Sequence, residues 1–566
     1  MKFVKPLLLW LAPLTFLAVF YFYPLANILS LSLERAEGGA LVTFGEALKS
    51  AAVQHVLWFT IWQAALSMLL TLLVGLPGAY LLARYQFRGK SLLRALTGVA
   101  FVMPTLVVAA GFNALLGPKG WVNLGLMSLF HLEQAPIAFI NTLGAILVAH
   151  IFYNVSIVLR LVGDFWARLD PRLEQAARSL GANRWQTFRQ VTLPLLAPAI
   201  LAAALLIFIF DFTSFGVVLV LGGPRYATLE VEIYYQTISL FNLPLAAVLS
   251  LVQLACTLAL TLTYSRLAAR LSHPLRQKSQ AATQKRLTTW RTRLFAGLMI
   301  GFLLILTTAP LLALAARSVT SPSAERTRAG LLVPGFTLGF YRALTLNEQQ
   351  SLFYAPPSTA VAISLGYADV TVVLALLIGL PAAWALSHHQ KSKINQALDP
   401  ILMLPLGTSA VTLGLGFIIT LDAPPLDLRA SPWLVPLAHT LVAFPFVVRS
   451  LTPALRSIQP RLRQAAAVLG ASPGQVLRAI DLPLVGRALL VAATFAFTIS
   501  IGEFGATALV ARPEYPTIPM VIYRYLSRPG GLNYGQAMAL STILMLTTLV
   551  GMLAIERLRV GDGHEF

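Results

Sequence analysis

The sequence predicts an all-α, polytopic membrane protein made of two parallel six-helix repeats with about twelve transmembrane helices. Hydrophobic residues make up 57% of the 566 residues and charged residues 11%, whereas soluble globular proteins have about 25% charged residues. Apolar runs of about 20 residues, enough to cross the hydrocarbon core of a bilayer, recur along the chain. A long stretch of sequence also occurs twice with constant spacing. These three observations exclude a soluble protein and indicate a duplicated membrane protein.

Twelve spans account for the apolar runs. The first run has a basic tip, as a signal peptide does, but it continues to about Leu31 without a small-residue cleavage site, so we expect an uncleaved span. The expected spans are residues 6–32, 57–83, 95–116, 140–159, 195–221, 245–265, 294–315, 357–386, 400–421, 433–448, 488–510 and 536–556.

The distribution of basic residues predicts the orientation. The formal net charge is +20, but no nucleic-acid partner is expected, because in a membrane protein the placement of the charges around the spans matters more than their sum. An even number of spans puts both termini on one side, and this side receives most of the 42 Lys and Arg residues. By the positive-inside rule, both termini lie in the cytoplasm.

The repeat relates the two halves of the chain by one offset of 289 residues without a gap. The matched pairs are Arg160 and Arg449, Gly181 and Gly470, Pro194 and Pro483, Phe215-Gly216 and Phe504-Gly505, and Tyr234 and Tyr523. Residues 1–266 form the first permease-like half, residues 267–293 a basic and flexible cytoplasmic linker, and residues 294–566 the second half. Parallel repeats imply a pseudo-two-fold axis along the membrane normal, with a pathway where the halves meet.

Each half interrupts its apolar spans with a polar, Arg-rich segment, residues 170–195 (elbow 1) and 459–484 (elbow 2). In elbow 1, Asp170 and Pro171 suit the start of a helix and Gly181 the position after its end. Asn183 then caps a second short helix, which we expect to stop before Pro194. In elbow 2, Ser472 and Pro473 start the second helix. Each elbow is therefore predicted to be a helix, a sharp turn and a helix.

A simple connection between spans would also produce such an elbow, but the duplication favours a docking function. Nine of the first thirteen positions from Pro171 and Pro460 are identical. Small alanines and a glycine allow close approach of another surface, and two equivalent elbows on a two-fold axis fit a partner that is itself a dimer.

The elbows resemble the EAA loop of the membrane permease subunits of type I ABC importers, whose pattern is E-A-A-x3-G-x9-I-x-L-P. The matching residues are Gln175, Ala176, Ala177, Gly181, Val191, Leu193 and Pro194, and Gln464, Ala465, Ala466, Gly470, Ile480, Leu482 and Pro483. Both copies have Gln in place of the first Glu, and Glu174 is adjacent in the first copy only. The resemblance implies a type I ABC permease fold, in which this loop forms a coupling helix in a cleft of the ATPase.

Two permease halves fused in one chain resemble the branch of thiamine and ferric-iron importer permeases. The resemblance implies import of a small solute across the inner (plasma) membrane of a prokaryote. The implied partners are a cytoplasmic ABC ATPase dimer, an extracytoplasmic solute-binding protein, either periplasmic or lipid-anchored, and membrane lipid. No cofactor is expected in this chain, since ATP and magnesium would bind to the partner ATPase.

The chain itself lacks the motifs of an ATPase or another enzyme. The closest approach to a phosphate-binding loop, Gly89-Lys90-Ser91, has Arg84 in the place of the required first glycine. No His/Cys cluster predicts a metal site, and no Ser/His/Asp set predicts hydrolysis. The alternative is an ion-gradient-driven secondary transporter of the major facilitator type, which also has twelve spans in two halves. That alternative does not explain the duplicated elbows.

Three acidic residues, Asp211, Asp369 and Glu503, lie within apolar runs. Each costs about 2.5–3.5 kcal/mol on insertion scales, so we expect them to face the protein interior or water. Asp211 and Glu503 lie in the equivalent fifth spans and are candidates for a pathway that carries a cationic solute; hydrogen bonding between helices is the alternative. The other pathway candidates are Ser214, Phe215, Gly216, Phe504 and Gly505. No role is assigned to Asp369, nor to His150 and His439, which the repeat aligns.

Overall fold

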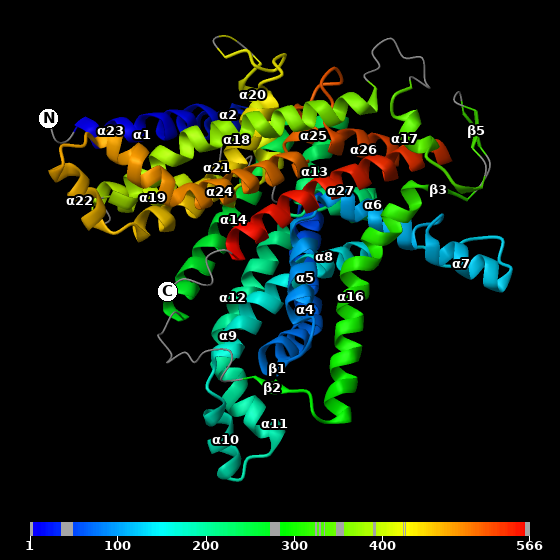
Figure 1. Cartoon of the computed structure of the whole chain (residues 1–566). Coiled ribbons are helices and arrows are strands. Elements are labelled where there is room, and N and C mark those ends of the chain that lie inside the picture. Colours follow the sequence, from blue (N-terminus) through cyan, green and yellow to red (C-terminus); the bar gives the residue numbers. More distant parts are fainter. Residues whose placement is uncertain are drawn as a thin grey trace. The chain divides into compact units, whose positions relative to one another are not determined.

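The computed structural model describes residues 4–34, 49–271, 284–322, 325–327, 330–332, 334–346, 356–388, 392–422, 424 and 426–560 (Figure 1). The chain forms two compact units, which are treated separately below. Unit 1 consists of Met1–Leu48, Ile233–Leu254 and Ser318–Phe566, and unit 2 of Lys49–Glu232 and Ala255–Arg317.

The predicted all-α membrane architecture is confirmed. In the described part of the chain, ten helices are long and apolar enough to cross a membrane, and the number rises to twelve if each of two bent helix pairs counts as one span. The strands are two or three residues long and form three separate pairs, of which β1–β2 is parallel and the others antiparallel.

Unit 2 contains most helices of the first half of the chain and one long helix of the second. Its elements are α4 (Ala51–Arg84), β1 (Tyr85–Gln86), α5 (Lys90–Val102), α6 (Thr105–Leu116), α7 (Trp121–Phe130), α8 (Leu143–Ile157), η2 (Val158–Val162), α9 (Gly163–Arg168), α10 (Pro171–Ser179), α11 (Arg184–Thr187), η3 (Phe188–Thr192), α12 (Leu193–Phe212), η4 (Val218–Gly222), η5 (Pro224–Tyr226), β2 (Lys285–Arg286) and α16 (Trp290–Ser318). Two boundaries with unit 1 fall inside helices, one after Glu232 in α13 (Leu229–Tyr234) and one after Leu254 in α14 (Leu243–Leu271).

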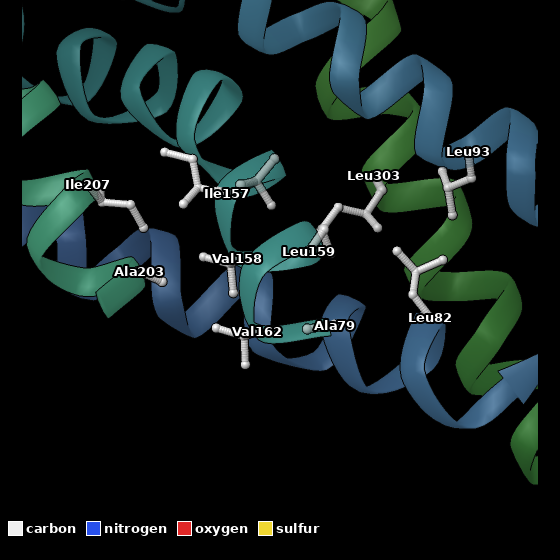
Figure 2. Packing of buried hydrophobic residues seen from close by; sticks show 11 residues of the cluster. Ala79, Leu82, Leu93, Ile157, Val158, Leu159, Val162, Ala203, Ile207 and Leu303 are labelled. Atoms are coloured by element: carbon white, nitrogen blue, oxygen red, sulfur yellow. The ribbon is translucent and has the colours of Figure 1, made fainter. Parts of the chain in front are cut away.

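The core of unit 2 is formed by α4, α5, α8, η2, α12 and α16, with Ala79, Val158 and Leu303 fully buried (Figure 2). Small residues let the helices approach closely. This matters in a bilayer because van der Waals packing, and not the hydrophobic effect, drives the association of helices there. A Cβ atom on Gly75 would lie 2.7 Å from Val158 Cβ. Gly75 therefore lies at a close helix contact. In unit 1, Gly379, which also begins a Gly-Leu-Pro sequence, meets Val447, the counterpart of Val158, in the same way.

Unit 1 contains most helices of the second half together with the first span of the chain. Its elements are α1 (Val4–Leu17), η1 (Ala18–Phe22), α2 (Tyr23–Glu34), η6 (Tyr235–Ser239), β3 (Thr320–Ser321), β4 (Glu325–Thr327), β5 (Gly330–Leu332), β6 (Gly335–Phe336), α17 (Gly339–Ala343), α18 (Pro357–His388), α19 (Lys393–Met403), η7 (Leu404–Gly407), α20 (Ala410–Thr420), α21 (Leu434–Ser457), α22 (Pro460–Val468), α23 (Pro473–Val476), η8 (Leu477–Asp481), α24 (Leu482–Gly502), α25 (Thr507–Val510), α26 (Ile518–Leu526) and α27 (Gly531–Val560). Its main core lies between α18, α21 and α24.

Each unit includes a first span from the opposite half of the sequence. In unit 1, Tyr21 of η1 forms a 2.7 Å hydrogen bond with Thr408, and a Cβ on Gly416 would lie 2.9 Å from Pro24. In unit 2, Trp121 donates to the carbonyl of Ala313 in α16 at 3.2 Å. The sequence halves, residues 1–266 and 294–566, therefore differ from the compact units. The first helices of the first half belong to unit 1, and the first helix of the second half, α16, belongs to unit 2.

The regions predicted as continuous spans at 95–116 and 400–421 each contain a sharply bent pair of helices. The helix pairs Lys90–Val102 with Thr105–Phe130 and Lys393–Gly407 with Ala410–Thr420 bend by 108° and 93°. In the first pair the break falls at Met103-Pro104, because a residue that precedes proline is disfavoured in the helical region. In the second it follows Pro405, and Ser409 caps the new helix by accepting from the Val411 and Thr412 amides.

The linker also differs in part from the flexible segment that was expected. Its end is ordered: Lys285 and Arg286 form β2, which pairs in parallel with β1, and α16 begins at Trp290. Residues 272–283 lie outside the described residues.

Candidate functional site

Elbow 1 has the predicted helix–turn–helix form. The Asp170 side chain accepts a hydrogen bond from the Arg172 amide at 3.0 Å, and α10 begins at Pro171. Asn183 and Gln186 form a reciprocal capping box at the start of α11, with two hydrogen bonds of 2.9 Å. Local side-chain chemistry therefore fixes both helix starts.

Elbow 2 repeats this form. The Ser472 amide donates to Gln475 Oε1 at 2.7 Å, and the Gln475 amide donates to Ser472 Oγ at 3.3 Å. Gly181 and Gly470 have φ angles of +90° and +85°, the left-handed conformation that favours glycine. A hydrogen bond from Ala182 to the Ala177 carbonyl closes the first turn at 3.1 Å, and the equivalent bond closes the second at 3.0 Å.

The second helix of each elbow does not stop before the proline, and that part of the prediction is wrong. One continuous helix of 29 residues runs from Arg184 to Phe212, and another of 29 residues runs from Gly474 to Gly502. A five-residue π-helical segment, η3 or η8, directly precedes the Leu-Pro pair in each. Proline lacks the amide hydrogen and its ring clashes with the carbonyl four residues earlier, and a π segment accommodates both defects without ending the helix. Each elbow is thus joined to its fifth span by an unbroken helix.

Each elbow has an ion pair on its first short helix. In elbow 1 the ion pair joins α10 to α4, and in elbow 2 it joins α22 to the long helix that follows. In elbow 1, Glu174 Oε1 lies 2.5 Å from Arg84 Nη2 at the end of α4 and accepts from Thr192 Oγ1 at 3.1 Å. In elbow 2, Arg463 Nε lies 2.7 Å from Asp481 Oδ1, and Trp384 Nε1 donates to Asp481 Oδ2 at 3.3 Å.

The offset of 289 aligns Glu174 with Arg463, which carries the opposite charge, and the uncharged Thr192 with Asp481. The acid lies on the short helix of elbow 1 and on the long helix of elbow 2. The carboxylate of Glu174 therefore has a partner within this chain. Asp481 is fully buried, so its charge depends on the arginine.

The residues that match the EAA pattern are exposed or half-buried. Gln175, Ala176 and Gly181 are exposed, as are Gln464, Ala465 and Gly470; Ala177, Ala466 and Leu482 are half-buried, and Leu193, Pro194 and Pro483 are exposed. Large apolar side chains are exposed beside them, with Leu180 89% and Leu469 87% accessible. An apolar, small-residue surface of this kind can dock another protein.

The fifth-span helices both end at the predicted pathway residues. Helix α12 ends at Phe212, so that Ser214 and Phe215 lie in a break before the next helical segment, which begins at Gly216. Helix α24 ends at Gly502, and Glu503, Phe504 and Gly505 lie in the break before α25. The FG pairs therefore lie at helix breaks in both halves.

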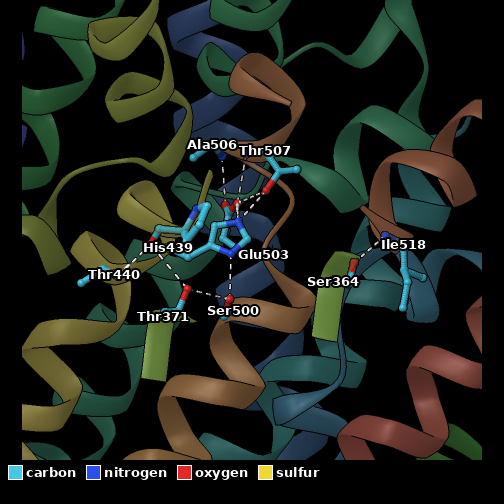
Figure 3. Close-up of polar contacts among 10 residues, drawn as sticks. Ser364, Thr371, His439, Thr440, Ser500, Glu503, Ala506, Thr507 and Ile518 are labelled. Carbon is cyan, nitrogen blue, oxygen red and sulfur yellow. Dashed lines mark hydrogen bonds and ion pairs between the residues drawn. The ribbon is translucent and has the colours of Figure 1, made fainter. Parts of the chain in front are cut away.

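Glu503 is held by a dense set of hydrogen bonds within unit 1 (Figure 3). Its carboxylate accepts from the amides of Ala506 and Thr507 at 2.9 and 3.0 Å and from Thr507 Oγ1 at 2.7 Å. It also lies 3.3 Å from His439 Nε2. The carboxylate thus satisfies amides at the start of the next helical turn, which are otherwise unpaired at a helix end.

Asp211 has a comparable environment within unit 2. Asn154 donates to Asp211 Oδ1 at 2.6 Å, His150 Nδ1 lies 3.3 Å from the same oxygen, and Gln63 donates to the Asp211 carbonyl at 3.0 Å. The exposed fractions of Asp211 and Glu503 are 1% and 9%. Asp369 differs from both, since its side chain on α18 is exposed.

His150 and His439 join these acids to serines, a role that sequence analysis missed. His150 Nε2 lies 2.9 Å from Ser214 Oγ, and His439 Nδ1 lies 2.8 Å from Ser500 Oγ. The offset of 289 aligns Asp211 with Ser500 and Ser214 with Glu503, so the acid and the serine exchange places around equivalent histidines. The constant offset of the two histidines was the signal that could have found these contacts.

Comparisons with known proteins agree with the duplicated architecture. The family described as "Binding-protein-dependent transport system inner membrane component" matches residues 75–277 and again residues 375–559. The chain is 30% identical over 536 residues to the thiamine transport system permease protein ThiP of Brucella abortus (strain 2308), which covers 94% of this chain and 92% of that protein. It is 29% identical over 517 residues to ThiP of Escherichia coli (strain K12), with 89% of each covered. A probable ABC transporter permease protein, y4fN of Sinorhizobium fredii (strain NBRC 101917 / NGR234), is 27% identical over 98% of this chain and 96% of its own length.

Proposed function

This chain belongs to the family of binding-protein-dependent transport system inner membrane components, and from this premise we propose that it is the permease of an ATP-driven thiamine importer. The chain is a permease subunit of a binding-protein-dependent importer and not itself an enzyme. This membership removes the alternative of a secondary transporter of the major facilitator type. The similarity to thiamine permeases along both halves of the chain is the observation that supports thiamine as the substrate.

Thiamine is preferred over ferric iron as the substrate. The thiamine permeases of Brucella abortus and Escherichia coli named above match about nine-tenths of this chain. Thiamine is an organic cation, so a pathway for it would benefit from acidic groups. We accordingly retain Asp211, Ser214, Phe215, Gly216, Glu503, Phe504 and Gly505 as the proposed pathway residues.

The proposed coupling sites are the two elbows. Each presents exposed small and apolar residues on a helix that is joined by a capped turn to a continuous 29-residue helix. A partner that binds α10 and moves it would pull on Glu174 and its contacts, and the continuous helix would carry the displacement toward Asp211. The π segment at Phe188–Thr192 gives that helix a local place to adjust.

The proposed partners are a cytoplasmic ABC ATPase dimer and an extracytoplasmic solute-binding protein. ATP and magnesium would bind to the ATPase, and this chain would need no cofactor. Both termini and both elbows would then face the cytoplasm, in agreement with the distribution of Lys and Arg.

An uptake assay tests the substrate. Cells that lack their own thiamine synthesis and import would express this chain together with the ATPase and binding protein encoded beside it, and accumulation of labelled thiamine would be measured. We expect uptake at low external thiamine that stops when the ATPase is inactivated and is insensitive to ferric iron. Uptake of labelled iron without uptake of thiamine would overturn the substrate and leave the permease function in place.

A further inference from the structure

A basic cavity lies between elbow 1 and the ordered end of the linker, entirely within unit 2. Its volume is about 1030 Å³, and it is lined by α4 and β1, by α10, by Arg184 of α11, by β2 and by the start of α16. These elements lie together at one end of the unit (Figure 1). Gln175 of the EAA-like pattern lines the cavity, whereas the exposed Leu180, which follows α10, does not.

The charge on the cavity wall is strongly unbalanced. Its titratable cations are Arg84, Arg178, Arg184, Lys285, Arg286 and Arg291, and its carboxylate is Glu174. Glu174 is already bonded to Arg84 and Thr192. The other five cations form no ion pair with any described residue of the chain. The linker cannot supply an acid either, since residues 266–293 contain no Asp or Glu.

A second cavity of about 610 Å³ continues the first toward the apolar helices. It shares Arg178, Arg184 and Arg291 with the basic cavity. The apolar and aromatic residues that it adds are Leu76, Pro77, Trp166, Trp185, Phe188 and Phe295. The aromatic rings pack against each other, with centroids 5.2 Å apart for Tyr80 and Trp166 and 5.9 Å for Trp185 and Phe188.

Together the two cavities form an amphipathic site, with the cations gathered in the first cavity and the aromatic rings in the second. Guanidinium groups match phosphate oxygens in a bidentate manner, and converging cations are stabilised by a bound anion. The site lies where α4 ends and α16 begins, and because both helices are candidate spans we expect it near the lipid headgroups. Basic pockets between helices at that level bind anionic headgroups.

We propose that this site binds a phosphate-bearing anion. A phosphate ester is the chemistry that the cations recognise, and its source is either an anionic membrane phospholipid or a soluble phosphate. The geometry favours the phospholipid, because its acyl chain would lie along Leu76 and Phe295 while its phosphate meets Arg178 and Arg291. The bound anion would tie elbow 1 to the start of α16.

The test uses the full chain purified in a neutral detergent and two probes, phosphatidylglycerol and inorganic phosphate. Each probe is titrated, and binding is measured by native mass spectrometry for the lipid and by calorimetry for phosphate. The test variant is Arg178→Gln with Arg291→Gln. The matched control is Arg172→Gln with Arg189→Gln, which removes two exposed charges from elbow 1 outside the cavity.

We expect the wild type and the control to bind phosphatidylglycerol and the test variant to bind it roughly tenfold or more weakly, since each basic residue contributes substantially to headgroup attraction. Binding of phosphate that the test variant loses and the control keeps would support the same site with a soluble ligand. If the test variant does not fold, Lys285→Gln with Arg286→Gln serves instead.

Equal binding by the test variant and the control, for both probes, would overturn the proposal. So would a result in which neither probe binds but the test variant loses its ATPase partner, because the arginines would then serve protein docking.

Discussion

His150 and His439 contact carboxylates through opposite ring nitrogens. His150 Nδ1 lies 3.3 Å from Asp211, whereas His439 Nε2 lies 3.3 Å from Glu503, and the remaining nitrogen of each ring meets a serine at 2.9 or 2.8 Å. The two halves thus keep one histidine geometry and exchange the acid between the two positions that flank it. Such an exchange preserves the number of hydrogen-bonding groups while it moves the carboxylate by three residues along the chain.

The first prediction concerns variants in which the acid of the first half is moved from position 211 to position 214, the position equivalent to Glu503. Asp211→Ser alone should lower the thermal stability of the full chain, because a buried polar group that loses its partner costs about 1–3 kcal/mol. Adding Ser214→Glu to Asp211→Ser should recover part of this loss, since the acid then occupies the position of Glu503. Melting temperatures of the purified chain in detergent measure both.

Ser214→Glu alone is the control for this pair. It places two carboxylates beside His150 and should destabilise the chain, because neighbouring like charges in a buried site oppose each other. If the stability loss of the double variant equals the sum of the losses of Asp211→Ser and Ser214→Glu, the two positions are not interchangeable sites for the acid, because coupled positions deviate from additivity by about 0.5–3 kcal/mol.

The second prediction concerns Arg463 and Asp481. Arg463→Met should strongly destabilise the second half, because Asp481 is fully buried and its charge would be left uncompensated, at a cost of about 3–5 kcal/mol. Arg463→Met with Asp481→Leu should be less destabilising than Arg463→Met alone. Thermal unfolding of the full chain checks the order, and a double variant that is worse than the single one would contradict it.

Elbow chemistry could be predicted from the sequence because it is local. Asp170, Asn183 and Ser472 cap helices that begin within three residues of them, and Gly181 ends a helix by its own conformation. No distant contact has to be known for these features.

Other features depend on distant contacts or on competing outcomes. A proline such as Pro194 is compatible with either a helix end or a π segment inside a longer helix, and packing decides between them. At Met103-Pro104 the opposite outcome holds and the helix breaks. The partners of His150, Asp211 and Ser214, lie 61 and 64 residues away along the chain, so the sequence shows that the histidine is duplicated but not what it contacts.

The third prediction tests docking at the elbows. Gly181→Asp and Gly470→Asp should each abolish uptake while the protein stays in the membrane. No atom lies within 4 Å of a Cβ placed on either glycine, so the new side chain would interfere with what docks there, apart from a strain of about 1 kcal/mol from the positive φ. Uptake and membrane abundance are measured together.

Gly181→Asn is the matched control for the third prediction. Asparagine adopts positive φ more readily than most residues and carries no charge. It should retain more uptake than Gly181→Asp. Undiminished uptake in a Gly181→Asp, Gly470→Asp double variant would exclude docking through these turns.

The fourth prediction concerns orientation. Ser179 lies on α10, in elbow 1, which we expect to face the cytoplasm, and Ser527 follows α26, in the segment between the last two expected spans, which we expect to face the outside; both are exposed. In a chain with Cys256 replaced, Ser179→Cys should react with a membrane-impermeant thiol reagent only after cells are opened, and Ser527→Cys should react in intact cells. Labelling of Ser179→Cys in intact cells, with Ser527→Cys labelled only in opened cells, would show that the topology is the reverse of the predicted one.

The last prediction separates a pathway role of the carboxylates from helix packing. Glu503 accepts two amide hydrogen bonds with two different oxygens, and Glu503→Gln leaves only one acceptor, so this change should lower stability whatever the pathway. Uptake must therefore be compared with stability in the same preparations. If the carboxylate also serves a cationic solute, uptake by Glu503→Gln should fall more than the uptake of Thr507→Val, which removes the 2.7 Å hydroxyl contact to Glu503 but keeps the charge. ATPase activity stimulated by the solute-binding protein should survive in both assembled complexes. Normal uptake in Glu503→Gln combined with Asp211→Asn would assign both acids to helix packing alone, since no negative charge would then remain beside either histidine.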